Sequence, residues 1–134
     1  PNHPLVKIFR GFVVFYQGKT DEAVSLIREV LEKNVKMEGI RPVLGVFLAA
    51  QGKTDEALAQ LTDETKALAK SDHDMAYWLA QAYSTLHQKD DAFKWLGRAI
   101  KLGNENKAWF EKDICLEFIR KDEHFAELMA KIEH

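Results

Sequence analysis

An internal repeat constrains the fold of this chain more than any other feature. The heptapeptide QGKTDEA at residues 17–23 recurs letter for letter at residues 51–57, an offset of 34 residues. Gly11 and Gly45 share this offset, and a weaker third copy, DDA at residues 90–92, follows after one inserted residue. A period of this length indicates supersecondary units that stack on their neighbours.

Each repeat unit has the apolar spacing of helices. After the shared heptapeptide, apolar residues follow at steps of three, four, seven and eight, which places them on one helical face. These residues are Ala23, Leu26, Ile27, Val30 and Leu31 in the first unit and Ala92, Trp95, Leu96, Ala99 and Ile100 in the third. The alternation expected for strands is absent, so the pattern predicts an all-α fold.

The spacing predicts helices at about 4–17, 20–34, 41–51, 54–70, 74–87 and 90–102. Gly18 and Gly52 suit the left-handed residue that closes a helix. Thr20 and Thr54 are the expected N-caps of the helices that follow, and the acidic pair after each threonine faces the positive end of the helix dipole.

A 34-residue helix-turn-helix unit in which G-x-x-D-E-A opens the second helix resembles the tetratricopeptide repeat. The resemblance covers units at 4–37, 38–72 and 73–106, and it implies a right-handed α-α superhelix of three helical hairpins within a single domain over 1–134. The positions that the family keeps small are Ala23, Ala57, Ala92, Gly11, Gly45 and Ala80. The chain departs from the family pattern at His87, which replaces the turn glycine, and at Val35, which replaces the usual proline.

Residues 107–134 resemble the segment that closes many bacterial tetratricopeptide arrays. Phe125, Leu128, Met129 and Ile132 share one helical face. Charged residues occupy the other face, at Lys121, Glu123, Glu127, Lys131 and Glu133. Stacked repeats need a terminal element with one polar side. The resemblance implies the carboxyl-terminal array of a larger bacterial protein, with further chain upstream of Pro1.

The first predicted helix is apolar on almost every side. Its apolar residues are Leu5, Val6, Ile8, Phe9, Phe12, Val13, Phe15 and Tyr16. Because one partner helix covers only one side, we expect further cover from an upstream repeat, a bound peptide or a second copy of the chain.

Composition excludes several classes of protein. The net charge of −2 argues against nucleic-acid binding through a basic surface. No uninterrupted apolar run is long enough for membrane insertion. A single cysteine, Cys115, excludes an intrachain disulfide and a multi-cysteine zinc site. We expect a cytoplasmic protein with no nucleic-acid partner, no membrane insertion, no metal and no cofactor.

The sequence carries no recognisable catalytic motif, so we predict no enzyme activity in this chain. A nucleophile needs a convergent base, yet the histidines are scattered, at His3, His73, His87, His124 and His134. Gly-Lys-Thr at 18–20 and 52–54 lacks both the upstream glycine and the preceding strand of a phosphate-binding loop.

In tetratricopeptide arrays the first helices of successive units line a concave groove that binds peptides or helices. By position, the resemblance implies partner-binding residues at Ile8, Phe12, Phe15, Tyr16, Val46, Ala49, Ala50, Tyr77, Gln81 and Ser84. One subfamily grips the terminal carboxylate of heat-shock chaperones with cationic and amide donors. The equivalent residues here are Ile8, Phe12, Val43, Asp74 and Trp78, which supply no such donor.

The expected function is therefore a protein-interaction module that binds an apolar peptide or helix in its groove. Two alternatives stay open: self-association through the apolar first helix, as a scaffold element, or a regulatory repeat domain of an upstream enzyme or transcription regulator.

Overall fold

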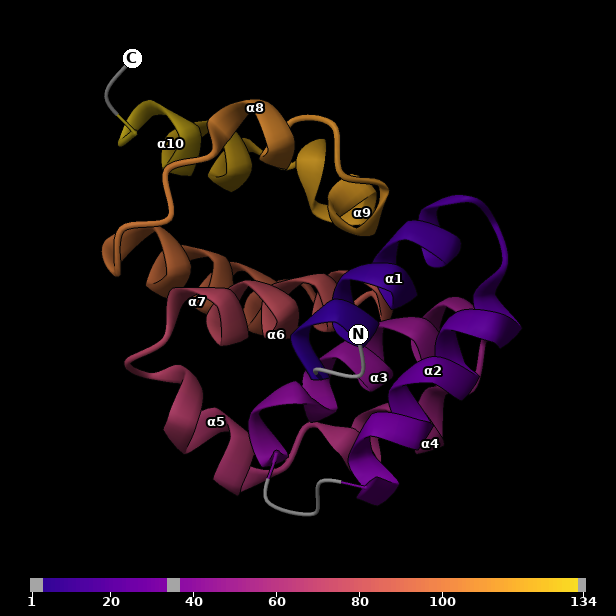
Figure 1. Cartoon of the computed structure of the whole chain (residues 1–134). Helices are drawn as coiled ribbons and strands as arrows, with labels where there is room; N and C mark the ends of the chain where they lie inside the picture. The colour runs from indigo at the N-terminus through magenta and orange to yellow at the C-terminus, as the bar shows by residue number, and fades with distance from the viewer. Residues whose placement is uncertain (1–3, 34–36, 133–134) are drawn as a thin grey trace.

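A computed structural model describes residues 4–33 and 37–132 (Figure 1). Every regular element within these residues is helical, which confirms the predicted all-α class. The expectations that concern Pro1, His3, Val35, Glu133 and His134 lie outside the described residues.

Three pairs of helices follow one another along the chain. They are α1 (Pro4–Tyr16) with α2 (Thr20–Lys33), α3 (Arg41–Ala50) with α4 (Thr54–Gln60), and α6 (His73–Thr85) with α7 (Lys89–Lys101). The two helices of each pair pack against each other, and α3 also packs against α2 and α6. The second pair therefore lies between the first and the third.

The same turn joins the helices of every pair. Gly18, Gly52 and His87 have positive φ angles of 87°, 80° and 62°. In the first turn the N–H of Gly18 donates to the carbonyl of Phe15, and the next N–H donates to the carbonyl of Val14. The same two hydrogen bonds recur around Gly52 and His87. The left-handed glycines are thus confirmed, and His87 adopts this conformation although it is not glycine.

Small residues let the paired helices approach closely. Ala23, Ala57 and Ala92 are fully buried. A Cβ atom added to Gly45 would lie 3.0 Å from Leu61 Cδ2 and 3.5 Å from the carbonyl oxygen of Ala57. The backbones of α3 and α4 therefore leave little room for a larger side chain.

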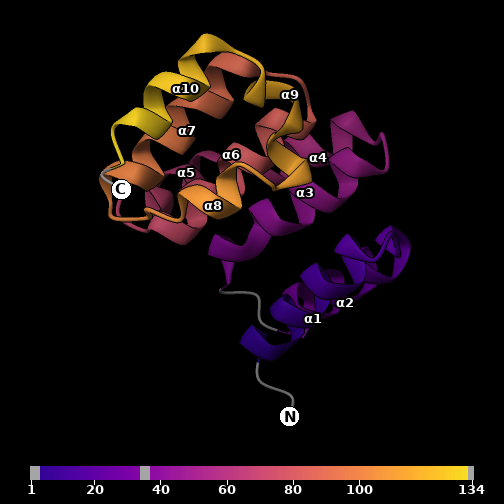
Figure 2. The same cartoon turned by 90° about the horizontal axis from the view of Figure 1, so that it is seen from above.

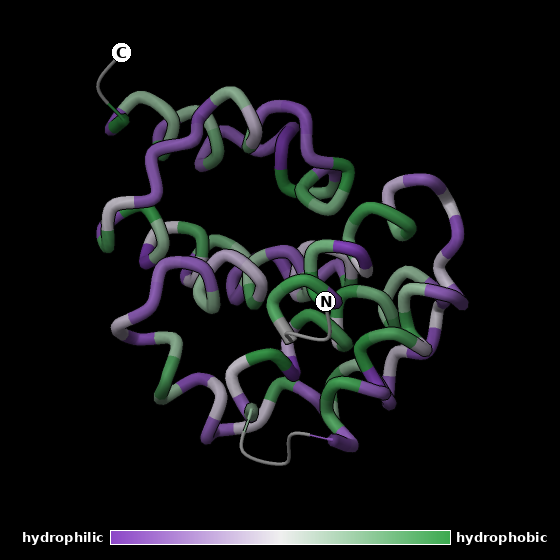
Figure 3. Tube along the Cα trace, in the orientation of Figure 1, coloured by the Kyte–Doolittle hydropathy of each residue, from purple (hydrophilic) through white to green (hydrophobic). Residues whose placement is uncertain are grey.

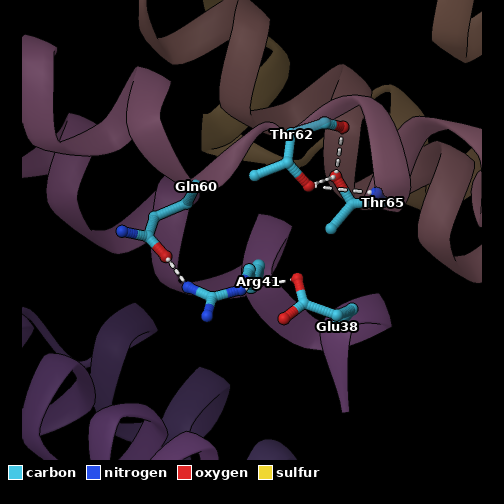
Figure 4. Close-up of polar contacts among 5 residues, drawn as sticks. All are labelled: Glu38, Arg41, Gln60, Thr62 and Thr65. Carbon is cyan, nitrogen blue, oxygen red and sulfur yellow. Dashed lines mark hydrogen bonds and ion pairs between the residues drawn. The ribbon is translucent and has the colours of Figure 1, made fainter. Parts of the chain in front are cut away.

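The predicted single helix at 54–70 is wrong, because it is broken into α4 and α5 (Asp63–Ala69). Leu61 leaves the helical region with φ −93° and ψ 65°, and its buried side chain reaches the surface of Gly45. The side chain of Thr62 then caps α5 by accepting a hydrogen bond of 3.1 Å from the N–H of Thr65 (Figure 4). The motif TDE at 62–64, as at 20–22 and 54–56, is the sequence signal for this new helix start.

The predicted N-caps are also wrong by one residue. Thr54 is already helical, and Lys53 holds the N-cap position without a side-chain hydrogen bond. Thr20 is likewise the first residue of α2. The left-handed glycine turns the chain so sharply that the helix resumes one residue earlier than expected.

A short 3-10 helix, η1 (Glu38–Ile40), leads into α3. Arg41 joins this entry to the end of α4, because its Nε donates to Glu38 Oε2 at 2.7 Å and its Nη1 donates to Gln60 Oε1 at 2.9 Å (Figure 4). These contacts connect the start of α3 to the last residue of α4.

The closing segment comprises α8 (Lys107–Phe110), η2 (Ile114–Leu116), α9 (Glu117–Arg120) and α10 (Glu123–Ala130). It packs on α6 and α7, over which it is drawn in Figure 2. Its predicted apolar face is confirmed, since Phe125, Leu128, Met129 and Ile132 are all buried. The charged residues of the other face, Lys121, Glu123, Glu127 and Lys131, are exposed.

The close approach of α3 and α4 predicts the effect of a larger side chain at Ala57. Ala57→Leu should lower the free energy of unfolding by about 1–3 kcal/mol because it overpacks this contact. Ala59→Leu, at an exposed position of the same helix, is the matched control and should change it by less than about 0.5 kcal/mol. Urea unfolding followed by circular dichroism measures both. Equal effects of the two variants would contradict the close approach.

Candidate functional site

A buried carboxylate from the closing segment lies between the first helices of the first and third pairs. Asp113 is fully buried. Its Oδ1 accepts hydrogen bonds from Tyr16 Oη at 2.9 Å and from the N–H of Cys115 at 3.0 Å. Its Oδ2 accepts from Tyr77 Oη at 2.5 Å and from Gln81 Nε2 at 2.8 Å. Residues of α1, α6 and the closing segment therefore meet at one side chain.

Local structure holds Asp113 in this position. Asp113 is the N-cap of η2, which orients its carboxyl group toward the repeats. The guanidinium group of Arg120 donates to the carbonyl oxygens of Asp113 at 2.8 Å and Phe110 at 3.0 Å. Removing a carboxylate from water is costly unless its oxygens are paired. The two phenols, the Gln81 amide and the N–H of Cys115 pair both oxygens of Asp113.

Burial and the charge of Asp113 together raise the pKa of three neighbouring groups. Burial, together with the negative charge of Asp113, raises the pKa of Tyr77 far above its ordinary value. Burial first, then Cys115 and Asp113, raise the pKa of Tyr16 in the same way. Burial and Asp113 also raise the pKa of the Cys115 thiol. Both phenols therefore remain protonated donors, and Cys115 lacks the lowered pKa of an activated nucleophile.

A pocket of about 490 Å³ opens beside this network, between α1, α6 and the start of the closing segment. Its aromatic lining comprises Phe9, Phe12, Tyr16, Tyr77, Trp78 and Trp109. Its polar lining comprises His73, Asp74, Gln81, Asn104 and Asn106. We call this cavity the aromatic pocket.

Ring contacts connect the aromatic pocket to the core. Phe12 meets the buried ring of Phe47 edge-on, with centroids 5.2 Å apart. The ring of Tyr16 meets that of Trp109 edge-on at 5.5 Å. Such contacts hold the walls of the pocket in place before any ligand arrives.

The ionisable side chains among the polar residues that line the pocket are His73 and Asp74. Among the described residues that line it there is no lysine and no arginine. His73 Nδ1 lies 3.3 Å from Asp74 Oδ1. The first N–H groups of α6 are occupied, because the carboxylate of Asp72 accepts from the N–H groups of Asp74 and Met75.

The structure divides the predicted partner-binding residues into two groups. Phe12, Tyr16, Tyr77 and Gln81 line the aromatic pocket. Ile8, Phe15, Val46, Ala49 and Ser84 are buried and do not line it, and the exposed Ala50 does not line it either. The closing segment, with Asp113, Cys115 and Leu116, packs against the first helix of the third pair.

Sequence reasoning missed several residues of this site. Phe9, Trp78 and Trp109 line the pocket, and Asp113 organises it. The only local signal for Asp113 is its place directly before the apolar residues ICL at 114–116, and charged residues at Glu111, Lys112 and Glu117 surround it without distinction. The repeat pattern ends before this residue and so carries no information about it.

No group of three or more His, Cys, Asp or Glu side chains within 4–33 and 37–132 is placed to hold a metal ion. No helix in the same ranges has the length and apolar character needed to cross a bilayer.

The raised tyrosine pKa values predict how stability changes at high pH. Above the ordinary tyrosine value of 10.0 the unfolded chain releases a proton that folded Tyr77 keeps, so the free energy of unfolding should fall as the pH rises. Tyr77→Phe should reduce this fall by about 1.4 kcal/mol per pH unit. At neutral pH the same variant should be less stable by about 1.5–3 kcal/mol, because a hydrogen bond to a carboxylate is lost.

Urea unfolding of the parent chain and of Tyr77→Phe between neutral pH and pH 11 measures both effects. Parallel alkaline slopes for the two proteins would contradict the raised pKa of Tyr77.

Comparison of the chain with protein-family models, with curated proteins and with solved structures finds no match in any of the three.

Proposed function

We propose that the chain is a tetratricopeptide-like array, a right-handed superhelix of three helical hairpins, that acts as a protein-interaction module. It binds a peptide or short helix along α1 and in the aromatic pocket. The internal repeat and the recurring turn around Gly18, Gly52 and His87 support the architecture. We further propose that the module is part of a larger protein, as the resemblance implies, and that it acts in the cytoplasm, in line with its single cysteine.

The observation that carries the binding function is an exposed apolar strip on α1 that runs into the aromatic pocket. Val6, Phe9 and Val13 are 44%, 72% and 55% exposed. Figure 3 shows α1 largely in the hydrophobic colour. Phe9 belongs to both the strip and the pocket. Contiguous apolar surface of this kind marks interaction sites on folded domains.

One face of α1 packs in the core, and the other face is exposed to a partner. Ile8 and Phe15 face the core and are buried, whereas Phe9 and Val13 lie on the opposite side and are exposed. Burying a large apolar side chain is worth about 1.5–3 kcal/mol. A partner that covers the strip and the pocket together would gain several such contributions without reordering the helices.

Selection of peptides from a display library tests this function. Selected peptides should bind the parent chain, and binding should be lost in Phe9→Ser and in Trp109→Ala. Leu68→Ser removes another exposed apolar residue, 44% exposed, on α5 outside the pocket, and should leave binding unchanged. Enrichment of no peptide, or equal binding by all three variants, would contradict the proposal.

The same strip favours self-association as a second candidate function. A second copy of the chain would cover Val6, Phe9 and Val13 as a peptide would. Size-exclusion chromatography with light scattering distinguishes the two. A dimer that dissociates on dilution and is absent in Phe9→Ser would favour self-association, whereas a monomer at every concentration would contradict it.

A further inference from the structure

We propose that the aromatic pocket binds the guanidinium group of an arginine side chain that the partner peptide presents. This inference rests on the proposed function and adds the chemistry of the group recognised. Three independent features of the pocket lead to it: its aromatic faces, its charge, and a buried acceptor without a donor.

The aromatic walls suit a planar cation. Trp78 and Trp109 line the pocket from α6 and α8, with Phe9 and Tyr16 from α1. Aromatic faces attract cations, tryptophan most strongly, and a guanidinium group also stacks flat on them. An ordinary apolar side chain would use the same walls, so the walls alone do not define the ligand.

The charge around the pocket is negative. Asp74 lies at its rim with a side chain that is 65% exposed. Three lining residues, Tyr16, Tyr77 and Gln81, donate to the Asp113 carboxylate, which does not itself line the pocket. Its oxygens accept only from neutral donors, namely two phenols, one amide and one backbone N–H. Arg120 binds the backbone carbonyl of Asp113 rather than its carboxylate. A cation in the pocket would therefore face negative charge in a partly dehydrated space.

A buried acceptor distinguishes a hydrogen-bonding cation from other ligands. Gln81 lines the pocket and is 2% exposed. Its Nε2 donates to Tyr16 Oη and Asp113 Oδ2. Its Oε1 has no hydrogen-bond partner within the described part of the chain. An unmet buried acceptor is costly. A guanidinium group carries five N–H donors, and one of them would meet this oxygen once the side chain of Gln81 shifts to open Oε1 to the pocket.

An anionic ligand fits the same pocket poorly. The N-terminus of α6 lies at the rim, but the Asp72 carboxylate already accepts from two of its N–H groups, those of Asp74 and Met75. The nearest basic group in the lining, His73, is paired with Asp74. A carboxylate or phosphate would meet Asp74, and the described lining holds no lysine or arginine to compensate.

A short peptide tests the inference directly. The probe is N-acetyl-Ala-Arg-Ala-amide, compared with the peptide that carries citrulline, a neutral isostere, in place of arginine. Binding is followed by the indole N–H signals in NMR spectra. The signals of Trp78 and Trp109 should shift and saturate, while that of Trp95, which is buried outside the pocket, should not. The citrulline peptide should bind about tenfold more weakly.

Single substitutions test whether the carboxylate of Asp74 contributes to binding of the arginine peptide. Asp74→Asn should weaken binding of the arginine peptide about threefold, the modest effect expected of an exposed carboxylate. Asp55→Asn makes the same change in the first turn of α4, outside the pocket, and should have no effect. Trp109→Ala should remove binding. Gln81→Leu is avoided because Gln81 also holds Asp113.

The outcomes separate this inference from the proposed function. Equal binding of the arginine and citrulline peptides, or equal effects of Asp74→Asn and Asp55→Asn, would overturn the arginine site. If the arginine peptide does not bind while display-selected peptides bind and are lost in Phe9→Ser, the arginine site fails and the interaction module stands. If neither kind of peptide binds, both proposals fail.

Discussion

One buried carboxylate connects the first and the third helical pairs of this molecule to its closing segment. Asp113 has no contact with water, so every hydrogen bond that it needs comes from the protein. Tyr16 and Tyr77 supply two of them from helices that are far apart in the sequence. The closing segment therefore binds to both α1 and α6 through Asp113. These hydrogen bonds help to hold α1 in place relative to α6.

The aromatic pocket is a consequence of that arrangement. Tyr16, Tyr77 and Gln81 each use a polar atom on the Asp113 network and also line the pocket. Their hydrogen bonds to the buried carboxylate orient these three side chains and place a negative charge directly behind the wall of the pocket. The apolar strip of α1 extends the same surface away from this charge. Rigid walls of this kind reduce the entropy that a partner must lose on binding.

The repeat predicted the parts of the fold that are governed by local sequence. Helix periodicity and the small residues at Ala23, Ala57 and Ala92 located the helical pairs, because both are properties of one unit and its neighbour. The break before Thr62 was missed because continuous apolar spacing hid a side-chain cap. The pocket was predicted only where α1 and α6 line it, since the role of Asp113 depends on a contact 97 residues away from Tyr16.

The reach of a single aspartate has a consequence for how such a chain can evolve. Repeat arrays usually lengthen by duplicating a unit, because each unit touches only its neighbours. Here the two oxygens of one side chain span from the first unit to the third. An extra hairpin inserted between them would draw Tyr16 and Tyr77 apart, so the carboxylate would lose at least one of its four donors. Insertion of a further helical pair between α1 and α6 would therefore carry an electrostatic penalty.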